Sequence, residues 1–159
     1  MSILIIRNNP YNDKDAIKNV SEYIVNDSKT FGMVGGNGIL PDCVADTMSL
    51  INNVYGIHNG KQILHFIVSF SKCENVSVDN ANEIAEKICC IFMNYCIVYG
   101  VHQDTDKLHI HFGVNPINRH NLRKLKFTRS DKYNLKRMIN NILMDYGILC
   151  EHMIDKYEP

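Results

Sequence analysis

Three histidines within ten residues are the feature of this sequence that most restricts its fold. His102 and His109 lie on either side of a short polar segment, residues 104–107, and His111 follows two positions later. Two β-prone runs flank the polar segment, an arrangement typical of a β-hairpin. If the middle two residues of that segment form the turn, His102 lies directly across from His109, with the two Cβ atoms about 4.5–5.5 Å apart.

The same register brings all three imidazoles to one patch of the sheet. His109 and His111 share a face because they are two residues apart, and their apolar neighbours point to the other face. Gly100 pairs with His111 and leaves room beside it. A single strand histidine is usually structural, but three converging ones predict a metal site. Imidazoles suit Zn²⁺, Ni²⁺ or Co²⁺, and a phosphate substrate would help to hold Mg²⁺ or Mn²⁺.

The apolar patterns along the chain predict the α+β class, with a central antiparallel sheet and helices mainly on one face. Strands are expected at residues 2–7, 61–71, 98–102 and 108–114, with a short one at 122–127. Helices are expected from 13 or 15 to 26, over 41–55 and 80–95, and from 130 or 131 to 145. The glycine-rich residues 31–40 are expected to form a mobile loop. No linker or repeat interrupts the pattern, so we expect a single domain over residues 1–159.

The histidine segment resembles the three-histidine motif of plasmid mobilisation relaxases, the Tyr–HUH single-strand endonucleases. Its pattern reads His102-x-Asp104-x4-His109-Ile-His111-x3-Asn115. Two upstream pieces resemble family motifs in the family's order. One, residues 16–30, contains Tyr23 and ends in the pair Lys29-Thr30, and the other is the strand His65-Phe-Ile-Val-Ser69-Phe70. The three pieces cover most of residues 11–118, and the histidine motif is the most specific of them.

The resemblance implies a relaxase/mobilisation nuclease domain with an HUH endonuclease-like fold. Such a domain nicks one DNA strand at a specific site in an origin of transfer and then transfers that strand. The nucleophile would be Tyr23, leaving a 5′-phosphotyrosine, and the metal, Mg²⁺ or Mn²⁺ by preference, would be held by His102, His109 and His111. Accessory mobilisation proteins are candidate partners.

Three further side chains are expected around this centre. Asp104 shares a face with His102 and is a candidate for orienting an imidazole. His65 lies on the polar side of its strand and is a candidate metal-supporting or phosphate-contacting residue. Asn115 has the same strand parity as His109 and His111 and is expected to hydrogen-bond DNA or a ligand.

Two other functions stay open on the sequence alone. A hydrolytic metallo-phosphoesterase would use a metal-activated water and would need no tyrosine. A non-cleaving module that binds a DNA hairpin or origin would need neither. Within the nicking hypothesis, Tyr11 and then Tyr99 are the rival nucleophiles.

Charge is balanced overall but uneven along the chain. Seventeen basic and seventeen acidic residues give a net charge of zero, which by itself argues against a nucleic-acid-binding protein. Residues 119–137, however, hold eight Lys or Arg and one acidic residue. We expect five of them to contact DNA phosphates: Arg119, Arg123, Lys124, Lys126 and Arg129. The alternative is an ordinary solvated helix face.

Cysteine usage and apolar run length suggest the compartment. The six cysteines form no Cys-x-x-Cys pair, and three lie in an apolar, helix-like run, so reduced thiols are expected. The apolar runs are too short to span a membrane, and the first residues lack the pattern of a signal peptide. These features predict a cytoplasmic protein with no membrane partner.

Overall fold

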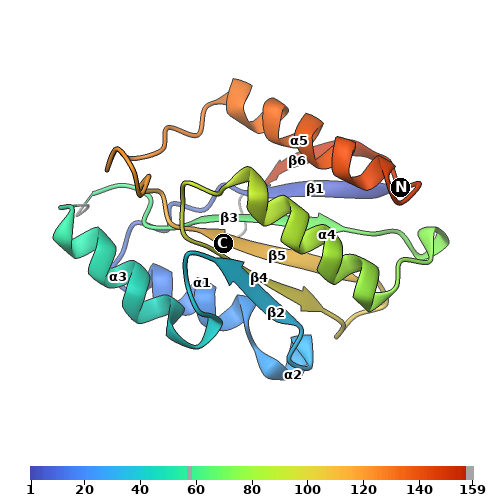
Figure 1. The fold of residues 1–159 in the computed structure, drawn as a ribbon, viewed down its shortest axis with the longest axis horizontal. Coiled ribbons are helices and arrows are strands. Elements are labelled where there is room, and N and C mark those ends of the chain that lie inside the picture. The colour runs from blue at the N-terminus through green and yellow to red at the C-terminus, as the bar shows by residue number, and fades with distance from the viewer. Residues whose placement is uncertain (57–58, 157–159) are drawn as a thin grey trace.

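The computed structural model describes residues 1–56 and 59–156, and a six-stranded sheet forms its centre (Figure 1). The strand order is β2-β4-β5-β3-β1-β6. All neighbouring strands are antiparallel except β1 and β6, which are parallel. The strands are β1 (Ser2–Arg7), β2 (Val34–Asn37), β3 (Leu64–Ser69), β4 (Ile97–His102), β5 (His109–Val114) and β6 (Cys150–Lys156).

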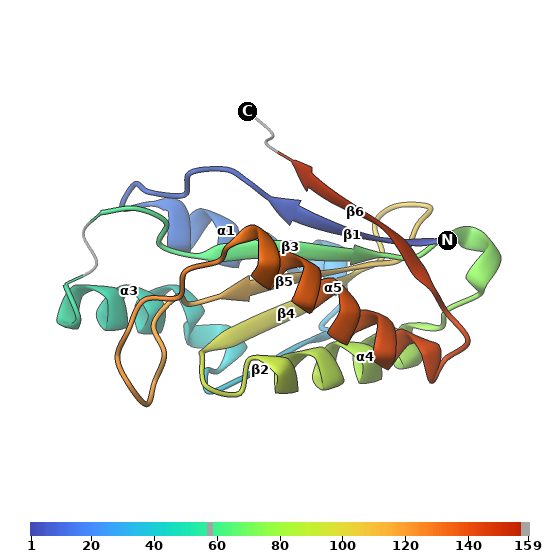
Figure 2. The same ribbon diagram turned by 90° about the horizontal axis from the view of Figure 1, so that it is seen from above.

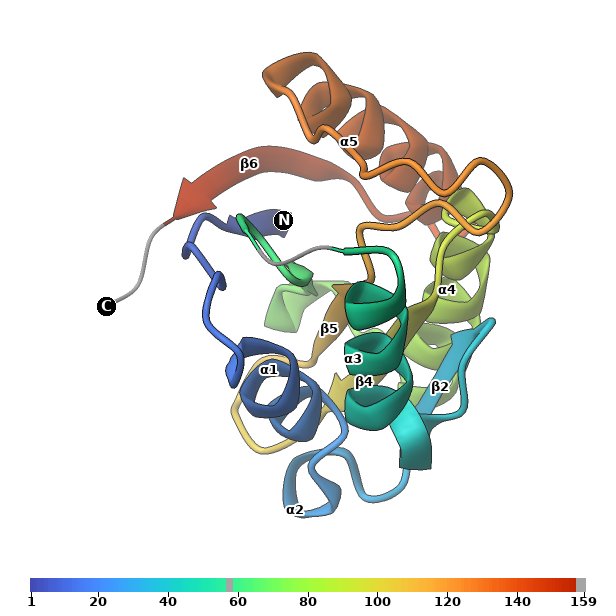
Figure 3. The ribbon, with the colours of Figure 1, turned by 90° about the vertical axis from the view of Figure 1, so that its left-hand side faces the viewer.

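Helices cover both faces of this sheet, α1 and α3 on one side and α4 and α5 on the other (Figure 3). The helices are α1 (Ala16–Ile24), the single-turn α2 (Asp27–Thr30), α3 (Val44–Val54), α4 (Val78–Ile91) and α5 (Arg129–Met144). Short 3-10 turns lie at Pro41–Cys43 and Lys72–Glu74. Side-chain caps begin the two longest helices: Ser77 accepts from the Asn80 amide, and Thr128 forms a capping box with Asp131.

The alternation of β5 separates an apolar core from the histidine face. Ile110 and Phe112 are fully buried in the larger core, which α4 and α5 close. His111 points the other way, toward the smaller core in which Val20 and Ile24 of α1 pack on Val98. Side chains two residues apart therefore line one face, and the apolar side of the hairpin anchors its polar side.

The predicted α+β class is confirmed, and two details differ from the expectation. The sheet is mixed, because β6 pairs in parallel with β1. This last strand was not predicted. Most of its side chains are exposed at the sheet edge, so it lacks the apolar alternation that marks a half-buried strand. The helices divide between the two faces instead of gathering on one, because β4 and β5 are buried on both sides.

The glycine-rich segment was wrongly predicted to be a mobile loop. It contains β2, an edge strand that pairs with β4. A Cβ at Gly35 would collide with the Tyr99 ring, and one at Gly36 with the carbonyl oxygen of Ile97. These two glycines therefore allow close approach between strands, a use that composition does not distinguish from flexibility.

Smaller boundary differences occur in the second half of the chain. In place of the short strand expected at 122–127, a single bridge joins Ile117 to Lys124. The last helix begins at Arg129 after its Thr128 cap, whereas the expected cap was Ser130 or Asp131, two or three residues later. Among the described residues, no helix is long and apolar enough to cross a membrane.

Candidate active site

The hairpin has the predicted register. His102 pairs with His109, and Gly100 pairs with His111. One nitrogen from each of the three imidazoles lies within 4.8 Å of the other two. His102 and His111 are buried, whereas His109 is partly exposed, so the cluster opens to solvent at the hairpin end. The prediction that these three side chains converge is confirmed.

Hydrogen bonds hold one nitrogen of His102 and one of His109 and leave the other available to a ligand. His102 Nε2 is 2.9 Å from the Ile24 carbonyl oxygen and must donate to it, so its Nδ1 carries the lone pair. That Nδ1 is buried and has no hydrogen-bond partner in the part of the chain that the structure describes. His109 Nδ1 lies 2.7 Å from the Lys107 carbonyl oxygen and donates in the same way. A buried acceptor with no donor is what a cation would satisfy.

The third imidazole belongs to a chain of side chains. His111 Nδ1 is 2.9 Å from His65 Nε2, and His65 Nδ1 is 3.2 Å from the Tyr11 hydroxyl. If His111 Nδ1 donates to His65, His111 offers Nε2 to an ion, and His65 then donates from Nδ1 to the Tyr11 oxygen. His65 thus lies on the histidine side of the sheet, and Tyr11 fixes its far nitrogen.

Burial makes the inner imidazoles neutral. Desolvation lowers the pKa of His111 well below its usual range, and the neighbouring histidines lower it further. Desolvation also lowers the pKa of His102, although the hydrogen bond to Ile24 opposes this. Both rings are therefore neutral at neutral pH, and neutral imidazole is the form that binds metals. The donor set, its lone pairs and its protonation all fit a divalent ion.

Tyr23 lies over this cluster. It belongs to the last turn of α1, and its ring centroid is 5.2 Å from those of both His102 and His111. The side chain is 42% exposed, so a large substrate can reach it. Lys29 Nζ lies 5.2 Å from the centre of the same ring. Of the rival tyrosines, Tyr99 lies on the opposite sheet face, where its hydroxyl donates to Asn82 and burial raises its pKa to about 12.

Asp104 and Asn115 have different neighbours from those expected. His102 is oriented by the hydrogen bond that its Nε2 donates to the Ile24 carbonyl oxygen. Asp104 instead accepts from Lys29 Nζ at 2.5 Å. Asn115 is fully buried: its amide donates to Asn52 Oδ1, and its oxygen accepts from the Ile117 amide. Strand parity does not describe Asn115, because β5 ends at Val114, one residue before it.

The basic segment lies away from the histidines. β5 runs from the hairpin to the opposite end of the sheet, and the chain that carries Arg119 to Arg129 continues from there (Figure 2). Arg119 donates to the Met93 carbonyl, Lys124 to that of Asn59, and Arg129 packs over the Tyr133 ring. All five predicted DNA-binding residues are exposed: Arg119, Arg123, Lys124, Lys126 and Arg129.

An open groove of about 380 Å³ adjoins the tyrosine and the histidine chain. Its lining includes Arg7 and Asn9 at the end of β1, together with Tyr11, Tyr23 and His65. Arg7 and Lys29 were not among the predicted site residues, and Tyr11 was considered only as a rival nucleophile. The signal for Arg7 was a basic residue at the end of an otherwise apolar strand. The signal for Tyr11 was its position in the turn that follows this strand.

Replacing Tyr11 by phenylalanine is expected to weaken divalent metal binding about tenfold, the lower range for losing an outer-sphere partner. The hydroxyl is the group that fixes His65, and φ at Tyr11 is +43°, a strained value that its surroundings must hold in place. Calorimetry with Mn²⁺ measures the affinity. Tyr55→Phe, on an exposed tyrosine after α3, is the control, and an equal change in both variants would contradict the expectation.

Replacing Gly100 by alanine is expected to destabilise the fold by about 1–3 kcal/mol through overpacking. The new Cβ would collide with the Ile24 carbonyl oxygen, part of the α1 terminus that carries Tyr23. Gly113→Ala is the matched variant, because its Cβ would meet only the ends of the Ile24, Ile63 and Val98 side chains. Urea unfolding compares the two, and an equal or larger cost at Gly113 would refute this account.

Comparisons with known proteins identify a family. The family model described as "Relaxase: MobA/VirD2-like, nuclease domain" matches residues 23–148. Protein TraI of Escherichia coli is 32% identical over 104 residues, which cover 63% of this chain and 13% of that protein. A solved structure described as "Molecular Basis of Vancomycin Resistance Transfer in Staphylococcus aureus" has a TM-score of 0.49 at 13% identity, over 78% of this chain and 74% of that one.

Proposed function

We propose that this chain, which belongs to the family of MobA/VirD2-like relaxase nuclease domains, nicks one DNA strand at a specific site. It then transfers the cut strand through a covalent protein–DNA link. The observation that carries the proposal is the position of Tyr23, whose ring centroid is 5.2 Å from those of two members of the histidine cluster. A hydroxyl beside a metal-binding cluster can attack a phosphate that the same cluster aligns.

The cluster of His102, His109 and His111 is the proposed metal site. A divalent ion held there, Mg²⁺ or Mn²⁺ by preference and Zn²⁺, Ni²⁺ or Co²⁺ as alternatives, would polarise the non-bridging oxygens of the scissile phosphate. His65 and Tyr11 support this set by fixing the proton of His111 on the nitrogen that faces away from the ion.

Tyr23 is the proposed nucleophile. Its oxygen forms a bond to phosphorus, and the bond from phosphorus to the 3′ oxygen breaks, so that the leaving strand takes up a proton as a 3′-hydroxyl. The product is a 5′-phosphotyrosine. One phosphodiester has been exchanged for another, so a later 3′-hydroxyl can reverse the step. Asp104 holds Lys29 beside the tyrosine ring.

The substrate we propose is single-stranded DNA at an origin of transfer, as expected of a conjugative or mobilisation relaxase. Accessory mobilisation proteins are the proposed partners. The cytoplasmic location stays a prediction, supported by six cysteines that are all free thiols.

The experiment that tests the function is a denaturing gel of the protein incubated with single-stranded DNA and Mn²⁺. A covalent adduct is expected, together with a free 3′-hydroxyl strand. Cleavage without an adduct would favour the hydrolytic phosphoesterase, and binding without cleavage would favour the non-cleaving module. Either result would overturn the nicking and transfer mechanism.

Reversing Arg123 and Lys124 to glutamate is expected to weaken single-strand binding about equally for all sequences. If the exposed basic segment grips phosphates, the slope of log affinity against log salt should fall by about 0.7 for each phosphate that the variant no longer neutralises. Lys87→Glu, at an exposed residue of α4 that lies 3.8 Å from Asp145, is the control for a change in net charge, and it is compared with Arg123→Glu alone so that the two charge changes are equal. An unchanged slope in the double variant would return the segment to an ordinary solvated surface.

A further inference from the structure

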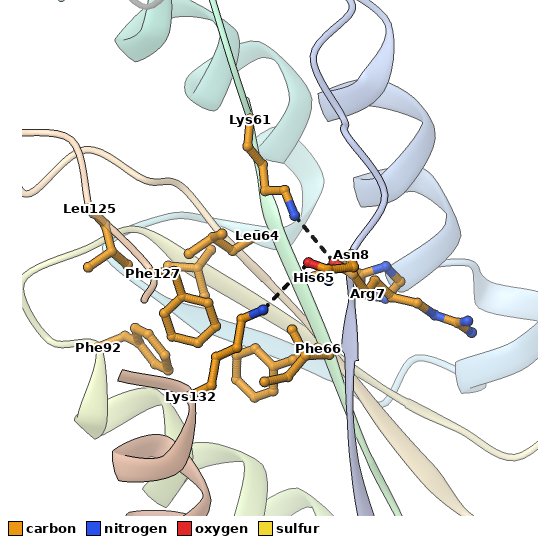
Figure 4. A pocket seen from close by; sticks show the side chains of 12 residues that line it. Arg7, Asn8, Lys61, Leu64, His65, Phe66, Phe92, Leu125, Phe127 and Lys132 are labelled. Carbon is orange, nitrogen blue, oxygen red and sulfur yellow. Dashed lines mark hydrogen bonds between the residues drawn. The ribbon is translucent and has the colours of Figure 1, made fainter. Parts of the chain in front are cut away.

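A second, smaller cavity lies where β1 ends and β3 begins, beneath the start of α5. Its volume is about 180 Å³. The walls are mainly apolar and include the rings of Phe66, Phe92 and Phe127 (Figure 4). The side chains of Lys61 and Lys132 reach across the same cavity, and their ammonium groups turn toward the backbone and side chains of Arg7 and Asn8. A cavity that is aromatic on one side and cationic on the other can hold a ligand with the same two parts.

The cationic side of this cavity has more positive charge than its carboxylates balance. Lys132 Nζ forms an ion pair with Asp155 at 2.6 Å and lies 3.5 Å from Asn8 Oδ1. Lys61 Nζ lies 3.4 Å from the Arg7 carbonyl oxygen and 5.8 Å from the centre of the Tyr11 ring, and it forms no ion pair with a carboxylate among the described residues. Burial lowers the pKa of Lys61, and the charge of Lys132 lowers it further, while the Asp155 carboxylate offsets part of the shift. An anion between the two lysines would relieve both effects.

The cavity is next to the proposed catalytic groove. Arg7 and His65 line both spaces, and the groove also contains Tyr11 and Tyr23. His65 is in turn hydrogen-bonded to the metal-cluster residue His111. The groove lies on the α1 face of the sheet and the cavity on the α4 and α5 face, and the two meet where β1 ends, with Lys61 Nζ 5.8 Å from the centre of the Tyr11 ring. A polymer held at Tyr23 reaches the two lysines by passing around this end of the sheet.

We propose that this cavity is a nucleotide subsite of the DNA track, with one phosphate on Lys61 and Lys132 and the adjoining base among the phenylalanine rings. The inference rests on the proposed function. Cavities for drug-sized ligands measure about 300–1,000 Å³, so a space of 180 Å³ suits a single ring system. Of the ligands that combine a flat ring with a phosphate, a nucleotide of the bound strand is the one that the neighbouring nuclease site supplies.

Lys61→Met tests the phosphate contact, since methionine keeps the length of the side chain and removes its charge. Binding of a labelled oligothymidylate is measured by anisotropy over a range of salt. We expect the salt slope to fall by about 0.7, the value for one phosphate contact on a single strand. Lys136→Met is the matched control: it lies one turn after Lys132 on α5 and donates to the Glu151 carbonyl. A slope equal to that of wild type would overturn the proposal.

Phe127→Ala tests the base. It should weaken oligothymidylate binding about tenfold, as loss of one stacking partner does, and should leave the affinity for an abasic strand of equal length unchanged. Equal losses for both strands would overturn the placement of a base. Tight binding of free thymidine monophosphate would overturn the assignment to the bound strand and make the cavity a free-nucleotide site instead.

The two proposals can fail separately. Adduct formation by the wild-type protein measures the nicking mechanism, and the salt response of Lys61→Met measures the subsite. A normal salt response in Lys61→Met, with an adduct in wild type, overturns the subsite alone. A changed salt response without any adduct in wild type overturns the mechanism and leaves the subsite standing.

Discussion

Tyr23→Phe is expected to abolish the covalent protein–DNA adduct completely. The substitution removes one oxygen and leaves a phenyl ring that has no group to attack phosphorus. Because the side chain is 42% exposed and α1 holds its place through its buried residues, the free energy of unfolding should change by less than about 0.5 kcal/mol. Metal and DNA affinity should also stay close to those of wild type. Denaturing gels, calorimetry and anisotropy measure adduct formation, metal affinity and DNA affinity, and urea unfolding measures stability.

The control for this result is Tyr11→Phe, which alters the other tyrosine of the groove. The adduct should still form in that variant, more slowly at limiting metal, because the Tyr11 hydroxyl acts through its hydrogen bond to His65 and does not attack phosphorus. Peptide mapping of the wild-type adduct locates the modified residue. A crosslink on any tyrosine other than Tyr23, or full nicking by Tyr23→Phe, would disprove the assignment of the nucleophile.

His111→Ala is expected to reduce divalent metal affinity by more than about 100-fold, beyond the range for losing an outer-sphere partner. The imidazole is one of three that converge, and the remaining two cannot enclose an ion as well. His65 would also lose its partner across β3 and β5. Calorimetry with Mn²⁺ measures the loss, and adduct formation should fall with it.

His152→Ala serves as the matched control, because this exposed histidine lies on β6 at the far edge of the sheet. Its metal affinity should equal that of wild type. If His111→Ala binds metal normally while remaining folded by circular dichroism, the histidine cluster is structural and the metal-dependent mechanism is wrong. If both variants lose affinity, the binding measured in wild type is unspecific.

The histidine hairpin was readable from the sequence because it depends on local geometry. A short turn fixes which residues face each other, and the two-residue period of a strand fixes which share a face. The pairings of His102 with His109 and of Gly100 with His111 follow from these two rules alone. The same period placed His65 on the histidine side of β3. The order of the motifs also placed Tyr23 at the end of a helix before the glycine-rich segment.

The contacts that complete the site were decided by tertiary structure. Gly100 is required because the α1 terminus packs on β4 and its Ile24 carbonyl takes the place of a side chain. Lys29 meets Asp104 across 75 positions of sequence, and Tyr11 meets His65 across 54. No local pattern encodes such distances. Strand parity likewise could not show that Asn115 turns into the protein interior after β5 ends.

The overall fold shows the same division between what the sequence determined and what only tertiary structure decided. The sequence alone determined the α+β class, the main helices and the central strands, since burial of one side leaves a periodic trace in the residues. It did not determine β6, whose exposed side chains leave no such trace, nor the mixed sheet that β6 creates with β1. Which face each helix covers depends on how distant segments pack, and that information exists only when the whole chain is folded.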